Sequence, residues 1–167
     1  TPLHLRSGGH ALEVVGFVIS LHIIGMYALS PLVGRAADLF GARTVIAAGG
    51  VLLALGAASA SGASADDSRG VFLGLFLIGL GWSCGLVAGS ALLVRTFDGP
   101  NRVGIQGLAD LCMTASGGLA GLGSGFMVAV VGYQNLARIG VVVGLAPTVV
   151  VAVMAISGRW ESRPEPA

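Results

Sequence analysis

Five long apolar windows constrain this chain more than any other feature of its sequence. Each holds about 20 residues or more, enough for a helix to cross the ~30 Å hydrocarbon core of a bilayer. That core has no water to bond to the backbone, so each segment must satisfy its own N–H and C=O groups, as a helix does. We therefore predict an all-α, polytopic transmembrane helical bundle with about five spans, at residues 11–33, 45–64, 70–94, 103–131 and 136–157.

The composition supports the same fold class. Hydrophobic residues make up 54% of the chain and charged residues 10%, whereas about a quarter of a soluble domain is charged. Transmembrane β-strands would be short alternating segments, and the sequence has none. We expect residues 11–157 to form one membrane unit in contact with the lipid bilayer, because the links between the windows are short. The polar segment 158–167 is predicted to be a disordered tail.

Charge placement predicts which side of the membrane each link occupies. All nine basic residues are arginines, and they lie outside or at the ends of the windows. Six belong to the links 34–44 and 95–102 and to the tail, and three lie on the other side. The positive-inside rule then places these links and the C-terminus in the cytoplasm of a cell-membrane protein. Residues 1–10 would lie outside the cell.

The first residues, Thr1-Pro2-Leu3-His4, contain neither an initiator Met nor the basic and apolar regions of a signal peptide. A first helix that starts outside the cell normally needs a signal or an even number of helices upstream. We therefore expect a fragment whose upstream helices, including the N-terminal half of the same polypeptide, are missing. A processed or trimmed chain is the alternative.

No sequence motif predicts an enzyme, a cofactor or a metal site. Cys84 and Cys112 both fall inside predicted helices, without the clusters that disulfides or metals need. There is no P-loop, no dinucleotide fingerprint and no basic–aromatic patch for nucleic acid. Residues 81–85 fit G-x-S-x-G, but the strand-to-helix turn on which this motif depends is not expected here. An intramembrane serine protease of the rhomboid type would take its base from a later helix, and no His follows His22.

Ionisable residues inside the spans are the candidates for solute binding or ion coupling, because such groups are costly in the membrane unless they face a bundle interior or water. His22 lies at the middle of the first window, and Glu13 lies near its outer boundary. Gln106 and Asp110 are four residues apart, on one face of the fourth window. The alternatives are a neutral His22 bonded to a neighbouring helix, and an Asp110 that pairs with Arg102 or meets water at the cytoplasmic mouth.

Glycines at every fourth residue predict close helix packing, since small residues let transmembrane backbones approach. Windows 45–64 and 136–157 have no central ionisable residue, so we expect outer or supporting helices there, the second one kinked at Pro147. The two predicted packing ridges are Gly81, Gly85 and Gly89 in the third window, and Gly117, Gly121 and Gly125 in the fourth.

The link GRAADLFGAR, residues 34–43, is charged and bounded by glycines. We expect a tight loop, because glycine tolerates turns. We expect Asp38 to accept hydrogen bonds from the first N–H groups of the next helix, where a carboxylate also favours the helix dipole.

Gly34, Asp38, Gly41 and Arg43 match the pattern G-x-x-x-D-R/K-x-G-R-R/K at the right spacing. With this motif the chain resembles the C-terminal half of a major facilitator superfamily transporter, and segments 22–43, 78–93 and 102–113 are also similar to bacterial members. The match departs at Leu39 and at Ala42, where basic residues are usual.

The resemblance implies secondary transport of a small solute by alternating access, ion- or proton-coupled, with the solute bound near the midplane. The five spans would be helices eight to twelve of a twelve-helix fold, and Thr1–His4 would end the seventh. Windows 11–33, 70–94 and 103–131 would face the cavity, and the 34–43 link would latch the two halves in one conformation. The alternative is a non-transporting membrane sensor or assembly subunit held together by the glycine ridges.

Overall fold

The computed structural model describes residues 12–62, 68–97, 99 and 101–157. The described part is helical, and five of its segments are long and apolar enough to cross a membrane, which confirms the predicted fold class. Two of these segments are each made of two consecutive helices. The helices are α2 (Leu12–Tyr27), α3 (Ser30–Phe40), α4 (Ala42–Gly62), α5 (Ser68–Thr96), α6 (Asn101–Val131), α7 (Tyr133–Gly144) and α8 (Ala146–Ile156).

Prolines explain both interrupted spans. Pro31 has no N–H, so the carbonyl of Tyr27 cannot receive the usual bond from four residues ahead. The Ser30 hydroxyl donates to that carbonyl instead, at 2.7 Å. Pro147 lies in the first turn of α8, directly after the break that separates α8 from α7. The predicted kink at Pro147 is therefore confirmed, whereas the break between α2 and α3 was not predicted.

The link between the first two spans is shorter than its sequence suggested. We expected a loop over residues 34–43, but α3 continues to Phe40 and α4 begins at Ala42. Gly41 alone separates the two helices, with φ at +85°. Glycine adopts such positive φ values without steric cost, so one residue is enough to reverse the chain. The expectation of a ten-residue loop was wrong.

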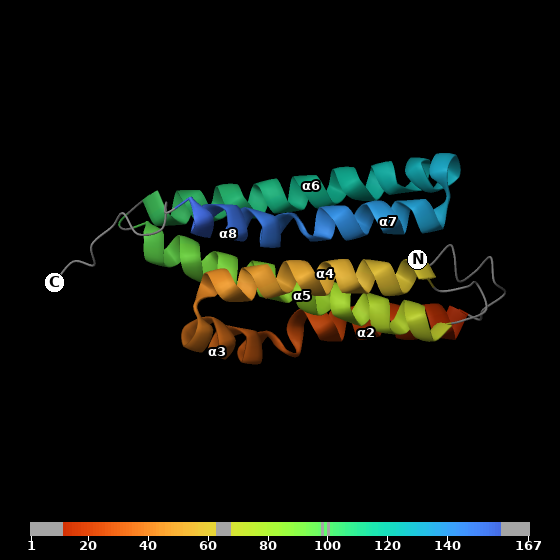
Figure 1. Cartoon of the computed structure of the whole chain (residues 1–167), viewed down its shortest axis with the longest axis horizontal. Coiled ribbons are helices and arrows are strands. Elements are labelled where there is room, and N and C mark those ends of the chain that lie inside the picture. The colour runs from red at the N-terminus through yellow and green to blue at the C-terminus, as the bar shows by residue number, and fades with distance from the viewer. Residues whose placement is uncertain (1–11, 63–67, 98, 100, 158–167) are drawn as a thin grey trace.

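Helices α4 and α5 form the centre of the bundle, and their mutual contact is the most extensive one. The α2–α3 segment packs on one side of this pair, and α7–α8 packs against α4 on the other (Figure 1). Helix α6 lies at the edge, and none of its residues is buried. We expected window 45–64 to be an outer or supporting helix. The corresponding α4 is not an outer helix, because it carries a row of buried residues and contacts four other helices.

Glycines set the distance between the packed helices. A Cβ on Gly81 of α5 would lie 2.7 Å from the carbonyl oxygen of Gly49 in α4. The same pair of helices touches at Gly56 and Gly74, where an added Cβ on Gly56 would lie 2.6 Å from the Gly74 oxygen. On the opposite face of α5, Gly79 lies against the His22 carbonyl of α2. These contacts leave no room for a side chain, so glycine is required where the backbones cross.

Of the six glycines in the two predicted packing ridges, one makes a close contact with another described helix. Gly81 makes the close contact just described, but a Cβ on any of the other five would meet no atom of a neighbouring helix within 4 Å in the described part of the chain. Those five face open space among the described residues: Gly85 and Gly89 of α5, and Gly117, Gly121 and Gly125 of α6.

Candidate functional site

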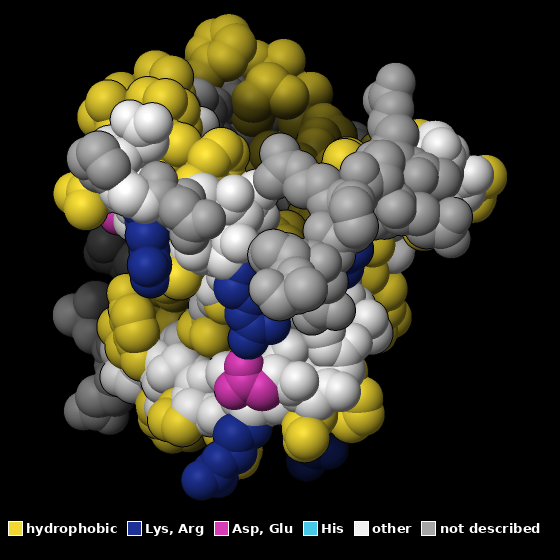
Figure 2. Space-filling model, turned by 90° about the vertical axis from the view of Figure 1, so that its left-hand side faces the viewer, with side chains coloured by type: hydrophobic (Ala, Val, Ile, Leu, Met, Phe, Trp, Pro, Cys, Tyr) yellow, Lys and Arg dark blue, Asp and Glu magenta, His cyan; other side chains and the backbone are white. Residues whose placement is uncertain are grey.

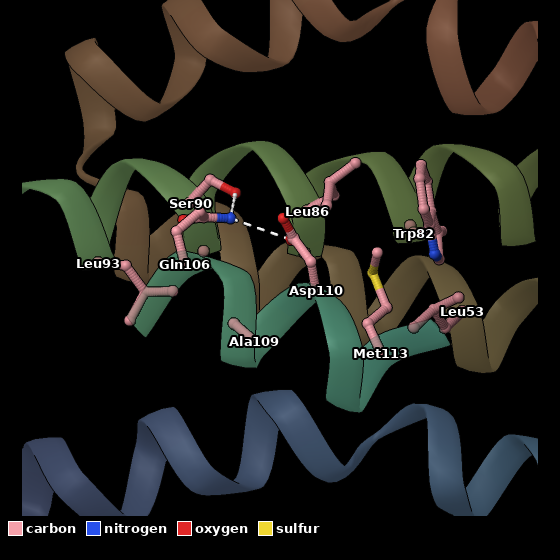
Figure 3. A pocket seen from close by; sticks show the side chains of 12 residues that line it. Leu53, Trp82, Leu86, Ser90, Leu93, Gln106, Ala109, Asp110 and Met113 are labelled. Carbon is pink, nitrogen blue, oxygen red and sulfur yellow. Dashed lines mark hydrogen bonds between the residues drawn. The ribbon is translucent and has the colours of Figure 1, made fainter. Parts of the chain in front are cut away.

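A pocket of about 300 Å³ lies between α5 and α6 (Figure 3). Its volume is at the lower end of the range for small-molecule sites, roughly 300–1,000 Å³. Its lining is mainly apolar, with a few polar groups at one end. The residues are Leu53 of α4, Gly81, Trp82, Gly85, Leu86, Gly89, Ser90 and Leu93 of α5, and Gln106, Ala109, Asp110 and Met113 of α6.

Three side chains form the polar end of the pocket. The amide nitrogen of Gln106 donates to the Ser90 hydroxyl at 3.3 Å and to Oδ1 of Asp110 at 3.1 Å. The amide therefore joins α5 to α6 and holds the Asp110 carboxylate in place. The Oε1 atom of Gln106 is buried without a hydrogen-bond partner among the described residues. The polar end can thus accept a hydrogen bond at the Gln106 oxygen, and it can pair with a positive charge at the Asp110 carboxylate.

The other end of the pocket is apolar and aromatic. Trp82 lies there with Leu53 and Met113, as Figure 3 shows. The Trp82 ring also contacts Tyr27 of α2 edge to face, with ring centroids 5.8 Å apart. Sequence reasoning did not single out Trp82 or Ser90. They are eight residues apart, about two helical turns, and this spacing could have placed them on one face of α5.

The other predicted candidates lie elsewhere. Nδ1 of His22 is 2.8 Å from the Leu75 carbonyl oxygen, and it must donate because a carbonyl only accepts. His22 thus joins α2 to α5 and does not line the pocket. Glu13 belongs to α2, but its side chain lies outside the described residues. Ser83, the serine of the G-x-S-x-G pattern, is completely buried, and its hydroxyl has no hydrogen-bond partner among the described residues.

The charged motif lies at one end of the bundle. Nη2 of Arg95, in the last turn of α5, donates to Oδ1 of Asp38 at 2.8 Å. Asp38 is part of α3, so the cap that we expected it to provide for the next helix is replaced by this ion pair. Gly34 lies beside Val87 of α5, with 3.9 Å between an added Cβ and the valine side chain. The motif therefore connects α3 to α5.

Arginines gather at this same end. Figure 2 shows the end of the bundle, with Lys or Arg side chains beside acidic ones and hydrophobic side chains around them. Four of the six described arginines lie in α3, in the first turn of α4, in the last turn of α5 and in the first turn of α6, which meet at this end, and the other two lie nearer the opposite end. The four are Arg35, Arg43, Arg95 and Arg102, and the two are Arg69 and Arg138.

Apolar helices of membrane-spanning length, charges at their ends and a polar group held between two of them define a multi-pass helical membrane protein. The profile of the Major Facilitator Superfamily matches residues 3–167. The chain belongs to this family. Comparison with solved structures found no match.

Curated relatives agree with the family. The uncharacterized MFS-type transporter YddS of Bacillus subtilis (strain 168) is 42% identical over 146 residues, which cover 87% of this chain and 33% of YddS. YdeG, an uncharacterized MFS-type transporter of the same organism, is 37% identical over 145 residues, 87% of this chain and 34% of YdeG. The riboflavin transporter RfnT of Brucella anthropi is 26% identical over 136 residues, 81% of this chain and 33% of RfnT. The chain thus spans about a third of the length of the relatives that it matches.

Proposed function

We propose that this chain is part of a secondary active transporter that moves a small solute across the cell membrane by alternating access. The observation that carries the proposal is the pocket between α5 and α6, where Gln106 holds the Asp110 carboxylate within a membrane-spanning helix, in a pocket with a mainly apolar lining. A carboxylate inside a membrane helix is costly and marks a solute or ion path. Membership of the family and relatives named as transporters support the same function.

The placement of the chain in the transporter is part of the proposal. The five spans act as helices eight to twelve, and the remaining helices close the solute site from the other side. The arginine-rich end faces the cytoplasm together with the C-terminus, in line with the positive-inside rule. There the Asp38–Arg95 pair opens and re-forms as the halves of the transporter move.

Coupling to an ion or a proton passes through Asp110 or His22. Asp110 is the stronger candidate because its carboxylate lines the pocket, whereas the His22 ring bonds to the backbone of α5. In the full-length protein, Asp110→Asn should flatten the dependence of solute uptake on external pH, and His22→Asn should have a smaller effect. Uptake by proteoliposomes at several pH values measures both variants.

The first solute to assay is riboflavin, since one relative is named for its transport. The comparison needs a matched control, and Ser124→Ala of α6 serves because the Ser124 hydroxyl bonds only to Gly121 of its own helix. If Asp110→Asn keeps the wild-type pH profile, Asp110 has no part in coupling. Absence of uptake for every solute tested, with correctly folded protein, would contradict the transport function itself.

A further inference from the structure

The pocket between α5 and α6 carries one charge. Asp110 is the only ionisable side chain among the described residues that line it. It has no ion-pair partner there, because the ion pair that the described residues form joins Arg95 to Asp38. Arg102 is two turns before Asp110 on α6 and does not line the pocket. The carboxylate is therefore available to a positive group brought by a ligand, and it repels an anion.

The rest of the lining determines what kind of cation fits. An inorganic ion needs several oxygen ligands, and no group of three His, Cys, Asp or Glu side chains gathers anywhere in the described part of the chain. A bare ion would also leave the apolar end of the pocket unfilled. That end offers Leu53, Met113 and the indole of Trp82. Apolar or aromatic groups pack well against such surfaces, and an indole face also attracts organic cations.

The oxygen of Gln106 supplies a second polar contact. Its Oε1 is buried and unpartnered among the described residues, next to the carboxylate that the same amide group holds. A buried acceptor without a donor is costly, and an N–H group of a ligand would remove that cost. Two acceptors, one of them charged, thus lie together at one end of the pocket, with the apolar surface at the other.

We propose that this pocket takes an amphipathic organic cation, with its ammonium group at Asp110 and its apolar or aromatic part against Leu53, Trp82 and Met113 (Figure 3). The assignment rests on the proposed transport function and narrows the class of solute. It also gives Asp110 a direct contact with the solute.

The test compares three probes of similar shape and different charge on the full-length protein: 2-phenylethylammonium, whose N–H groups can also donate to the Gln106 oxygen, 2-phenylethanol and 2-phenylethanesulfonate. Equilibrium binding of each is measured by calorimetry in detergent. We expect the ammonium compound to bind at least about tenfold more tightly than the alcohol, and the sulfonate not to bind, since one favourable charge contact near a protein surface is worth a factor of this size or more.

Variants separate the charge of Asp110 from its structural role. Asp110→Asn keeps the shape and should lower the affinity for the ammonium compound to that for the alcohol, while the affinity for the alcohol stays the same. Asp110→Glu keeps the charge and should keep the preference for the cation. Trp82→Phe should retain more of the affinity for the ammonium compound and for the alcohol than Trp82→Leu, because only the first keeps an aromatic face for the phenyl ring that these probes share.

Equal binding of the ammonium compound and the alcohol, or an Asp110→Asn variant with wild-type affinity for the cation, would overturn the assignment. Uptake into proteoliposomes distinguishes this failure from failure of the proposed function. If riboflavin or the sulfonate is taken up but the ammonium compound does not bind, the proposed transport function is supported and the proposed class of solute is contradicted. If the cation binds in a way that depends on Asp110 but no solute is taken up, the assignment of the pocket is supported and the proposed transport function is contradicted.

Discussion

Helix α5 contacts two neighbours in the chain, α4 and α6, in opposite ways. Toward α4 it presents Gly74 and Gly81, and the two backbones lie so close that an added Cβ on either glycine would overlap the carbonyl of the other helix. Toward α6 it presents Gly85, Gly89 and Ser90, and a pocket separates the helices. Glycines at regular spacing are present on both faces. The difference shows that the spacing permits close packing but does not impose it.

The two faces also differ in chemistry. Small residues pack at the α4–α5 contact, and α4 has a row of buried alanines and glycines. The α5–α6 contact instead includes the hydrogen bond that Gln106 of α6 donates to Ser90 of α5. Lipid tails provide no hydrophobic drive for helix association, so close packing and polar contacts are the two available means. Helix α5 uses the first on one face and the second on the other.

The largest expected effect tests the packed face. Gly81→Val places a branched side chain where a Cβ alone would be 2.7 Å from the Gly49 oxygen. Overpacking of this kind costs about 1–3 kcal/mol or more, so the thermal unfolding temperature in detergent should fall clearly. Gly121→Val on α6 is the matched control and should change stability by less than about 0.5 kcal/mol, because a Cβ there meets no atom of another described helix within 4 Å. A similar loss at Gly121 would show that the α6 ridge has a partner beyond the described residues.

A smaller effect tests the polar face. Gln106→Leu removes both bonds of the amide and leaves Ser90 and Asp110 without that partner. Hydrogen bonds between membrane helices average about 0.6 kcal/mol each, and an i, i+4 Gln–Asp bond within a helix adds about 0.2–0.5 kcal/mol. The free energy of unfolding should therefore fall by about 1 kcal/mol in a denaturant titration. Ser124→Ala, which removes a bond within α6 alone, should have less effect. No difference between the two variants would mean that the amide does not join α5 to α6.

The smallest expected effect concerns the ion pair between α3 and α5. The Asp38 and Arg95 side chains are 69% and 57% exposed, and exposed pairs contribute about 0.2–1 kcal/mol. A double-mutant cycle with Asp38→Asn and Arg95→Gln should give a coupling energy in this range, and added salt should lower it further. A coupling energy well above about 1 kcal/mol would contradict this expectation. It would mean that the ion pair stabilises the bundle as strongly as the glycine contacts do.

Local chemistry made part of the fold predictable. The spans follow from the length of the apolar windows, and the break before α8 follows from Pro147, because proline removes a backbone donor wherever it stands. The i, i+4 spacing of Gln106 and Asp110 was enough to place them on one face of a helix. The same rule applies to Pro31, but the break before it was missed because residues 11–33 were treated as one continuous apolar span. The one-residue turn at Gly41 was missed because apolar content does not show where a helix ends.

The sequence by itself determined that this chain is a set of membrane-spanning helices, because only an apolar helix of this length can satisfy its backbone in a bilayer. The motif around Asp38 was also visible in the sequence, and it indicated the family. Only the tertiary structure decided that α4 is central and α6 peripheral, that Asp38 pairs with Arg95, and that Trp82 and Ser90 share a pocket with Asp110. Each of these features depends on which helices pack against each other and on how far they are shifted along the bundle axis. Contacts between helices that are distant in the chain determine both.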